Sequence, residues 1–276
     1  MAYPGSAPAG PRLNVDFSAI LPYQTTLRNG VPVVLQQLII PNTVDRHHRN
    51  RLGVTDGARC IASRSTVRSM CALLNLEIQG GRTYPFEAEM SDEVFLNYYC
   101  GYDVFVLRAE DAVESSNEVG VPLLEDPTLV GCFYIKPNFP GRSSHICNAG
   151  FLVAPAYRNS GAGYIMGERF RHLAKALGYR GSMYNLVYRT NEASNKLWEK
   201  LGFVNVGVIP KAGRLCLEPP KDRVADSTTP AKKEEGYVDA LMWYFDLTVP
   251  EIPHLRAHWE PPLAGVVRQQ RIAAKL

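Results

Sequence analysis

Strand-like and helix-like hydrophobic patterns alternate through the second half of the chain. Apolar runs at 147–153, 182–188 and 204–209 predict buried strands. Helical spacing at 163–177 and 191–200 predicts a helix between each strand and the next. Such alternation is typical of an α/β domain in which helices flank a central sheet.

The first half of the chain places helices before the central strands. Helical spacing at 67–76 and 94–99 is followed by strand-like runs at 104–107 and 129–136. The run at 31–38 follows an Arg-Asn-Gly turn and contains a proline, which predicts a first strand at the edge of the sheet. The strand at 147–153 is then the fourth.

One domain with extended ends accounts for the whole pattern. Residues 1–12 predict a disordered tail and residues 13–249 a single domain, because no internal repeat divides the chain. The stretch 211–236 is polar and rich in proline, which predicts a surface insert before an aromatic-rich strand at 240–247. Residues 250–276 form a C-terminal extension.

Composition narrows the classes of protein to consider. The chain has 276 residues, 46% hydrophobic content and a net charge of +3, so it is long enough for one well-buried domain and lacks the basic character typical of nucleic-acid binding. No apolar run reaches the length of a membrane helix. Six cysteines without a Cys-x-x-Cys pair favour a reducing compartment, and His145 with Cys147 offers too few ligands for a metal.

The chain ends in Ala274, Lys275 and Leu276, a close variant of the Ser-Lys-Leu peroxisomal address. The N-terminus has neither the basic nor the apolar region of a secretory signal. We therefore expect a cytoplasmic or peroxisomal protein.

The strongest local signal is a strand that ends in an Arg-x-x-Gly-x-Gly turn and opens a helix. Arg158, Gly161 and Gly163 mark this turn, which we call the cofactor loop (residues 158–163). The first amides of a helix have no partner within it and bind phosphate oxygens, and glycines let a ligand approach the backbone. The dinucleotide fingerprint requires a third glycine and a later acidic residue, and the ATP loop requires Gly-Lys-Ser/Thr. Both are missing.

The cofactor loop resembles that of the GNAT superfamily of acetyltransferases, where R/Q-x-x-G-x-G/A holds the diphosphate of coenzyme A. The segment 191–203, which reads NEASNKLWEKLGF, resembles the superfamily's N-x-x-A/S-x-x-L-Y/W-E-K-L-G-F helix and turn. The resemblance implies the GNAT fold, a mixed sheet with the loop between the fourth strand and the following helix, and acetyl-CoA as donor with no metal. It implies these cofactor-binding residues: Leu152, Val153, Arg158, Asn159, Ser160, Gly161, Ala162, Gly163, Asn191 and Trp198. Asn191 is equally well placed to cap its helix.

Further segments resemble the fungal proline-analogue N-acetyltransferases, which acetylate azetidine-2-carboxylate and related imino acids. They include NLEI at 75–78, FLNY at 95–98, FYIKPN at 133–138 and CNAGFLV at 147–153. The resemblance implies that Asn148 and Asn185 hold a small amino-acid acceptor. The insert at 211–236 and the long ends depart from that family and leave the acceptor open.

Acetyl transfer to an amine requires a group that removes a proton. An alkyl ammonium with a pKa near 10.4 is neutral in about one part in a thousand at neutral pH. No histidine falls on the central strands except His145, which precedes Asn148, and asparagine cannot act as a base. We therefore expect a water relay positioned by Asn148 and Asn185, with Tyr184 as a further catalytic candidate and Tyr134 or Tyr188 nearby.

Two further expectations concern the chemical step. A backbone amide at the end of the strand 151–153 is expected to stabilise the oxyanion. Direct transfer needs no covalent enzyme intermediate, so Cys147 is not expected to act as a nucleophile.

Two other functions remain compatible with these residues. Acetylation of a protein lysine or N-terminal amine would use the same cofactor half with a wider acceptor groove. A non-catalytic acyl-CoA-binding module would keep the loop without turnover. Relatives of this fold often pair, so a homodimer is expected.

Overall fold

The computed structural model describes residues 15–41, 57–111, 123–217 and 234–249. The predicted N-terminal tail, most of the insert, and the C-terminal extension with Ala274, Lys275 and Leu276 lie outside these ranges. The expectations about disorder and targeting therefore stay predictions.

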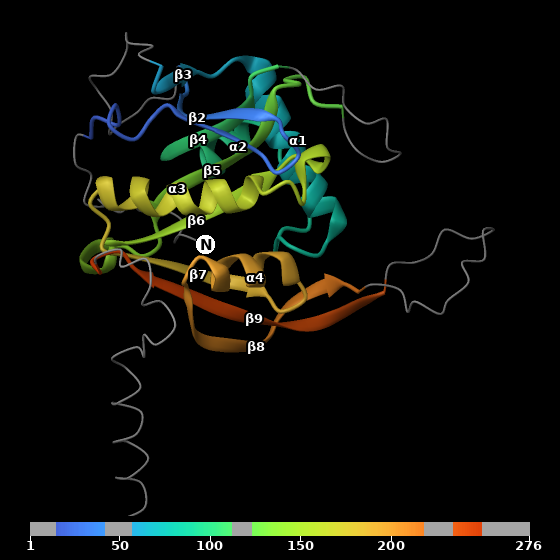
Figure 1. Cartoon of the computed structure of the whole chain (residues 1–276). Coiled ribbons are helices and arrows are strands. Elements are labelled where there is room, and N and C mark those ends of the chain that lie inside the picture. The colour runs from blue at the N-terminus through green and yellow to red at the C-terminus, as the bar shows by residue number, and fades with distance from the viewer. Residues whose placement is uncertain (1–14, 42–56, 112–122, 218–233, 250–276) are drawn as a thin grey trace, which may run out of the picture.

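A nine-stranded mixed sheet with four helices forms the described part of the chain (Figure 1). The strand order is β1-β2-β4-β5-β6-β7-β9-β8, and β3 pairs with β2. The strands are β1 (Tyr23–Thr26), β2 (Pro32–Ile39), β3 (Arg59–Ile61), β4 (Asp103–Ala109), β5 (Leu129–Pro137), β6 (Ile146–Val153), β7 (Gly181–Tyr188), β8 (Val204–Cys216) and β9 (Glu235–Asp246). The helices are α1 (Arg64–Gly80), α2 (Asp92–Tyr99), α3 (Ala162–Ala176) and α4 (Glu192–Lys200).

Helices cover both faces of the sheet. Phe133 of β5 lies 6.3 Å from Phe170 of α3 between ring centroids, whereas the next residue, Tyr134, lies 4.8 Å from Tyr99 of α2. Successive strand residues point to opposite faces, so α2 and α3 cover opposite sides. Figure 1 shows α3 lying across β5 and β6. The predicted α/β architecture is confirmed.

Strands β6 and β7 separate soon after they meet. They pair in parallel through only two residue pairs, Ile146 with Gly181 and Cys147 with Ser182. Beyond these pairs β7 continues beside β9, which in turn pairs with β8, and Figure 1 shows this group leaning away from β6. The sheet therefore has a splayed centre that sequence alone could not establish.

Two predicted features of the sheet are wrong. The strand at 31–38 is not an edge strand, because β2 pairs with β1 and β4, and Pro32 is tolerated as its first residue. The short strands β1 and β3 were not predicted, so the strand before the cofactor loop is the sixth in the chain rather than the fourth.

The predicted boundaries of the polar insert also need correction. β8 continues to Cys216 and β9 begins at Glu235, so 211–216 and 235–236 belong to a long antiparallel hairpin. All of these residues except Leu215 are at least partly exposed, because β8 lies at the end of the strand order, where one side of a strand faces water. The N–H of Cys216 donates to the carbonyl of Gly81 at 2.9 Å, which ties the hairpin to the loop after α1.

Candidate active site

The cofactor loop presents free backbone amides at the start of α3. Gly161 caps the helix with a φ of +93°, and the first intrahelical bond runs from the N–H of Ile165 to its carbonyl at 3.1 Å. The amides of Ala162, Gly163 and Tyr164 precede that bond and have no partner within the helix. Asn159 also adopts a left-handed φ of +61°, which shapes the turn before the helix. This arrangement suits an anion such as a diphosphate.

The turn between β1 and β2 supports the cofactor loop. The N–H of Arg28 donates to the carbonyl of Ser160 at 2.9 Å, and the Ser160 hydroxyl donates to the carbonyl of Tyr157 at 2.6 Å. The Arg28 side chain packs against Gly161, where an added Cβ would lie 3.4 Å from its Nε. A second arginine therefore stands beside the loop, and its distance of 130 residues in the sequence from Arg158 hid it from sequence analysis.

Arg158 of the cofactor loop forms an ion pair with Glu77 of α1. The guanidinium donates to the Glu77 carboxylate at 2.7 Å, and that carboxylate also accepts a hydrogen bond from the Thr83 hydroxyl at 2.5 Å. Arg158 is about half exposed, so solvent weakens the pair and an incoming anion can compete for the arginine.

The splay turns the backbone of β6 towards open space. The N–H of Asn138 donates to the carbonyl of Ile146 at 2.8 Å. This bond shows which residues of β6 direct their backbone N–H and C=O groups towards β5. The backbone groups of the even-numbered residues of β6 bond to β5, and those of the odd-numbered residues point towards β7. Because β7 has moved away, the backbone groups of Ala149, Phe151 and Val153 border the cleft.

Three asparagines form a hydrogen-bonded network where β6 and β7 separate. Asn138 is fully buried, and its Oδ1 accepts from Asn148 Nδ2 at 2.9 Å and from Asn185 Nδ2 at 2.7 Å. Its Nδ2 donates to Asn185 Oδ1 at 2.9 Å. The structure thus brings together the two predicted substrate residues. The third member, Asn138, had not been identified as a site residue, since nothing in its local sequence distinguishes it from a loop asparagine.

Tyr184 belongs to a different layer from the asparagines. Its ring lies 4.5 Å from Trp198 and 5.1 Å from Phe203 between centroids, in the aromatic cluster under α4. Burial raises the pKa of Tyr184 well above its ordinary value. The phenol therefore keeps its proton at neutral pH and is unsuited to accept one.

Three tyrosines and a buried lysine stand next to the asparagines. Tyr98 and Tyr134 line the cleft together with Tyr84, and a Cβ at Gly150 would lie 2.6 Å from the Tyr134 ring. Lys136 places its Nζ 4.3 Å from the ring centroids of both Tyr98 and Tyr134. We call the part of the cleft lined by Tyr84, Tyr98, Tyr134, Asn148 and Asn185 the tyrosine–asparagine end.

A cleft of about 810 Å³ joins the tyrosine–asparagine end to the cofactor loop. The predicted site residues line it except Ser160, whose hydroxyl is bonded within its own turn, and Tyr188, which is buried in a separate small core cluster. Asn191 lines the cleft and also caps α4, accepting from the N–H of Ser194 at 3.2 Å. The lining includes residues that sequence analysis did not assign to the site: Arg28, Glu77, Tyr84, Tyr98, Lys196 and Lys200.

Cys147 is fully buried beside the splay. Burial raises the pKa of its thiol to about 12, so the thiolate is scarce at neutral pH. This agrees with the expectation that Cys147 is not a nucleophile.

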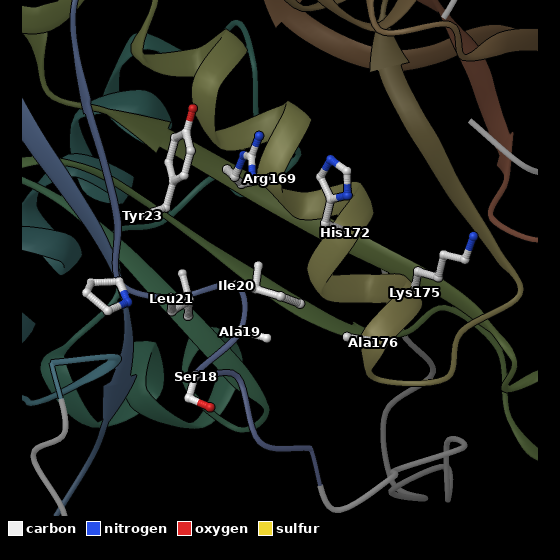
Figure 2. Close-up of a pocket in the computed structure, with 10 residues that line it drawn as sticks. Ser18, Ala19, Ile20, Leu21, Tyr23, Arg169, His172, Lys175 and Ala176 are labelled. Atoms are coloured by element: carbon white, nitrogen blue, oxygen red, sulfur yellow. The ribbon is translucent and has the colours of Figure 1, made fainter. Parts of the chain in front are cut away.

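A second cavity of about 670 Å³ lies elsewhere, between α3 and residues 18–23, which lead into β1 (Figure 2). Its basic side chains are Arg169, His172 and Lys175, and the Arg169 guanidinium lies 3.9 Å from the Tyr23 ring centroid. It contains none of the predicted site residues. The cleft at the splay is therefore the candidate active site.

The described residues contain neither a metal-binding cluster nor a membrane-spanning helix. No group of three or more His, Cys, Asp or Glu side chains in this part of the chain is arranged to hold a metal ion. Within the same ranges, no helix combines the length and apolar character needed to span a membrane.

Comparisons with known proteins agree with this geometry. Residues 82–203 match the model of the acetyltransferase (GNAT) family. The N-acetyltransferase aca1 of Schizosaccharomyces pombe is 37% identical over 176 residues, which cover 62% of this chain and 76% of that protein.

Solved structures share the fold. A GCN5-related N-acetyltransferase from Kribbella flavida superposes with a TM-score of 0.51 at 24% identity, over 67% of this chain and 94% of that one. The protein yncA of Salmonella typhimurium, solved with its cofactor acetyl-CoA, superposes with a TM-score of 0.50 at 15% identity, over 70% and 95% of the two chains. The chain belongs to the acetyltransferase (GNAT) family and is an acyltransferase that uses acetyl-CoA.

Proposed function

We propose that this enzyme acetylates the amine of a small molecule, an amino acid or cyclic imino acid of the proline-analogue type. The observation that carries the proposal is the network of Asn138, Asn148 and Asn185 where β6 and β7 separate. It presents amide groups to the cleft beside the exposed backbone of β6, in a part of the cleft narrowed by tyrosine rings. Such a setting favours a compact acceptor over an extended peptide.

In this proposal, the two ends of the cleft hold the two substrates. The free amides of α3 and Arg158 would hold the diphosphate of acetyl-CoA, assisted by Arg28, while Leu152, Val153, Asn191 and Trp198 would flank the rest of the molecule. Acetyl-CoA supplies the thioester that is attacked by the acceptor amine. The backbone amides of β6 in the splay would stabilise the negative charge that develops on the carbonyl oxygen.

Side chains of the cleft would support proton transfer from the acceptor amine. Asn148 and Asn185 would position the amine and a water molecule that receives its proton, because asparagine itself cannot be the base. Tyr184 stays a further catalytic candidate: its raised pKa keeps its hydroxyl protonated, so it could act only as a proton donor, and its buried hydroxyl would first have to become accessible to the cleft. Asn138 would act as a positioning residue that orients both other asparagines.

A substrate panel tests the proposal. Thiol release from acetyl-CoA is measured with azetidine-2-carboxylate, proline, polyamines and lysine-containing peptides, and acetyl-CoA binding is measured separately by calorimetry. We expect turnover with the cyclic amino acids. Turnover with peptides alone would reject the proposed acceptor class, and tight acetyl-CoA binding without turnover on any amine would indicate a non-catalytic acyl-CoA-binding module.

A further inference from the structure

Lys136 is a buried cation that the proposed chemistry leaves without a role. It lies near the end of β5, directly opposite Asn148 of β6, and only 4% of its surface is exposed. Its ammonium contacts two aromatic faces and makes one long hydrogen bond, to the carbonyl of Tyr98 at 3.5 Å. Among the described residues no carboxylate pairs with it. A buried charge without a counter-ion is costly, so its presence calls for an explanation.

The surroundings of Lys136 are suited to an anion. Tyr98 and Tyr134, whose rings hold its ammonium, both line the cleft, as does Tyr84. Burial raises the pKa of Tyr84 and of Tyr134 well above the ordinary value, so their hydroxyls remain hydrogen-bond donors at neutral pH. Glu77 is the carboxylate that lines this cleft, and it is engaged by Arg158 and Thr83.

Lys136 and the asparagine network lie on the same face of the sheet, at neighbouring positions. Residues directly opposite in an antiparallel pair have Cα atoms about 5 Å apart, and their side chains share one face of the sheet. Lys136 and Asn148 are such a pair. An acceptor whose amine lies at Asn148 would therefore have its carboxylate near the lysine and the tyrosine hydroxyls.

We infer that Lys136 determines specificity for acceptors that carry a free carboxylate, by placing its ammonium beneath the tyrosines that bind this group. This inference rests on the proposed function and adds to it a residue that selects the acceptor. Lys136 touches neither the donor nor the reacting amine in this role.

The test compares azetidine-2-carboxylate with azetidine-2-carboxamide on the wild type and on Lys136→Met. Methionine keeps the length of the side chain and removes its charge. We expect the KM for the carboxylate to rise about 10- to 100-fold in the variant, the range for loss of the attraction of one charge about 6 to 12 Å away at an effective dielectric constant of about 20, and the KM for the carboxamide to change less than about 3-fold. Lys175→Met, at the second cavity, is the matched control and should change neither value.

Measurements besides turnover keep the test decisive. Lys136→Met should melt at or above the temperature of the wild type, because an apolar side chain replaces an unpaired buried charge. Calorimetry with coenzyme A present should show the carboxylate binding more tightly than the carboxamide to the wild type, with this preference lost in the variant.

Two results would overturn the inference. One is equal affinity of the wild type for the two compounds. The other is a loss of kcat for both compounds in Lys136→Met, accompanied by loss of a limb in the pH profile, which would assign Lys136 to proton transfer. Failure of the proposed function looks different: acetyl-CoA binds and no amine, charged or neutral, is acetylated.

Discussion

The two ends of the cleft are built in different ways. The cofactor loop is a continuous stretch of backbone that leads into α3, where the amides of Ala162, Gly163 and Tyr164 supply the donors. The tyrosine–asparagine end is made of side chains from α2, β5, β6, β7 and the loop after α1, and each depends on its neighbours for orientation. A site made of backbone should tolerate many substitutions, whereas a network of side chains should fail when one member is removed.

The largest effect is expected at the asparagine network. Asn148→Ala removes an amide that we place against the acceptor and frees one acceptor site on the buried Asn138. By analogy with the loss of a single preorganised donor, kcat/KM should fall about 100- to 1000-fold. Steady-state kinetics with azetidine-2-carboxylate measure the change.

The matched control for Asn148→Ala is Asn205→Ala. Asn205 is an exposed residue of β8 whose side chain bonds only to a nearby backbone amide, that of Gly207, among the described residues. Its variant should keep the wild-type rate. A kcat/KM near the wild-type value in Asn148→Ala would contradict the claim that the side-chain network at the tyrosine–asparagine end fails when one member is removed.

The charge of Lys136 should appear in the pH dependence of stability. Burial lowers the pKa of Lys136 from its ordinary value of 10.5 to about 8. Between these two values the unfolded chain holds the proton and the folded chain does not, so the free energy of unfolding should rise with pH across this window. The rise relative to Lys136→Met should be about 3 kcal/mol, since one pKa unit corresponds to about 1.4 kcal/mol.

Urea unfolding of the wild type and Lys136→Met at several pH values from 7 to 10.5 measures this difference. If the difference in free energy of unfolding between the two proteins stayed constant over this pH range, Lys136 would not be a cation whose burial destabilises the fold.

Within the cofactor loop, Arg158 is the side chain expected to matter most. Arg158→Gln should weaken acetyl-CoA binding about 10-fold, at the low end for a charged hydrogen bond because the arginine is half exposed. Glu77→Gln should act in the opposite direction by releasing Arg158, with binding about 2-fold tighter. Calorimetry at low and moderate salt measures both affinities for acetyl-CoA. Equal affinities in the two variants would show that Arg158 does not bind the diphosphate.

Gly163→Ala should have a smaller effect. It tests whether the glycine is needed for acetyl-CoA to approach the backbone, because the added methyl group should not disturb folding. An added Cβ there meets Leu197 at 3.6 Å and Val153 at 4.0 Å, which are ordinary contacts, and alanine favours a helix. The melting temperature should therefore stay the same or rise. The KM for acetyl-CoA should increase about 3- to 5-fold if the diphosphate lies against this backbone, and an unchanged KM would place it elsewhere.

Cys147→Ala should have the smallest effect on turnover. The thiol is buried with a pKa of about 12, and direct transfer requires no covalent enzyme intermediate. The kcat should remain within about 2-fold of the wild type under single-turnover and steady-state conditions. Burst kinetics lost in this variant would instead indicate an acyl-enzyme.

This contrast also explains what the sequence could and could not predict. The cofactor loop was found because Arg158, Gly161 and Gly163 are close in sequence and a strand and a helix flank them, so local order determines the site. Most helices and strands were placed within a few residues for the same reason. The splay depends on where pairing stops, and no local pattern encodes the separation of β6 from β7.

The acceptor end was only partly predicted. Asn148 and Asn185 came from a family resemblance, whereas Asn138 and Lys136 acquire their significance from burial and from partners on other strands. Arg28 lies far from Arg158 in sequence and reaches the loop through the turn between β1 and β2. Such residues can be found only once the strands are assembled.

The absence of a side chain at Gly150 has a consequence for the evolution of this enzyme. The Tyr134 ring occupies the space that even a methyl group at position 150 would need. A larger residue there would push the ring into the opening, narrowing the range of admitted molecules without disturbing the donor's binding site. One codon could therefore retune which amines the protein accepts.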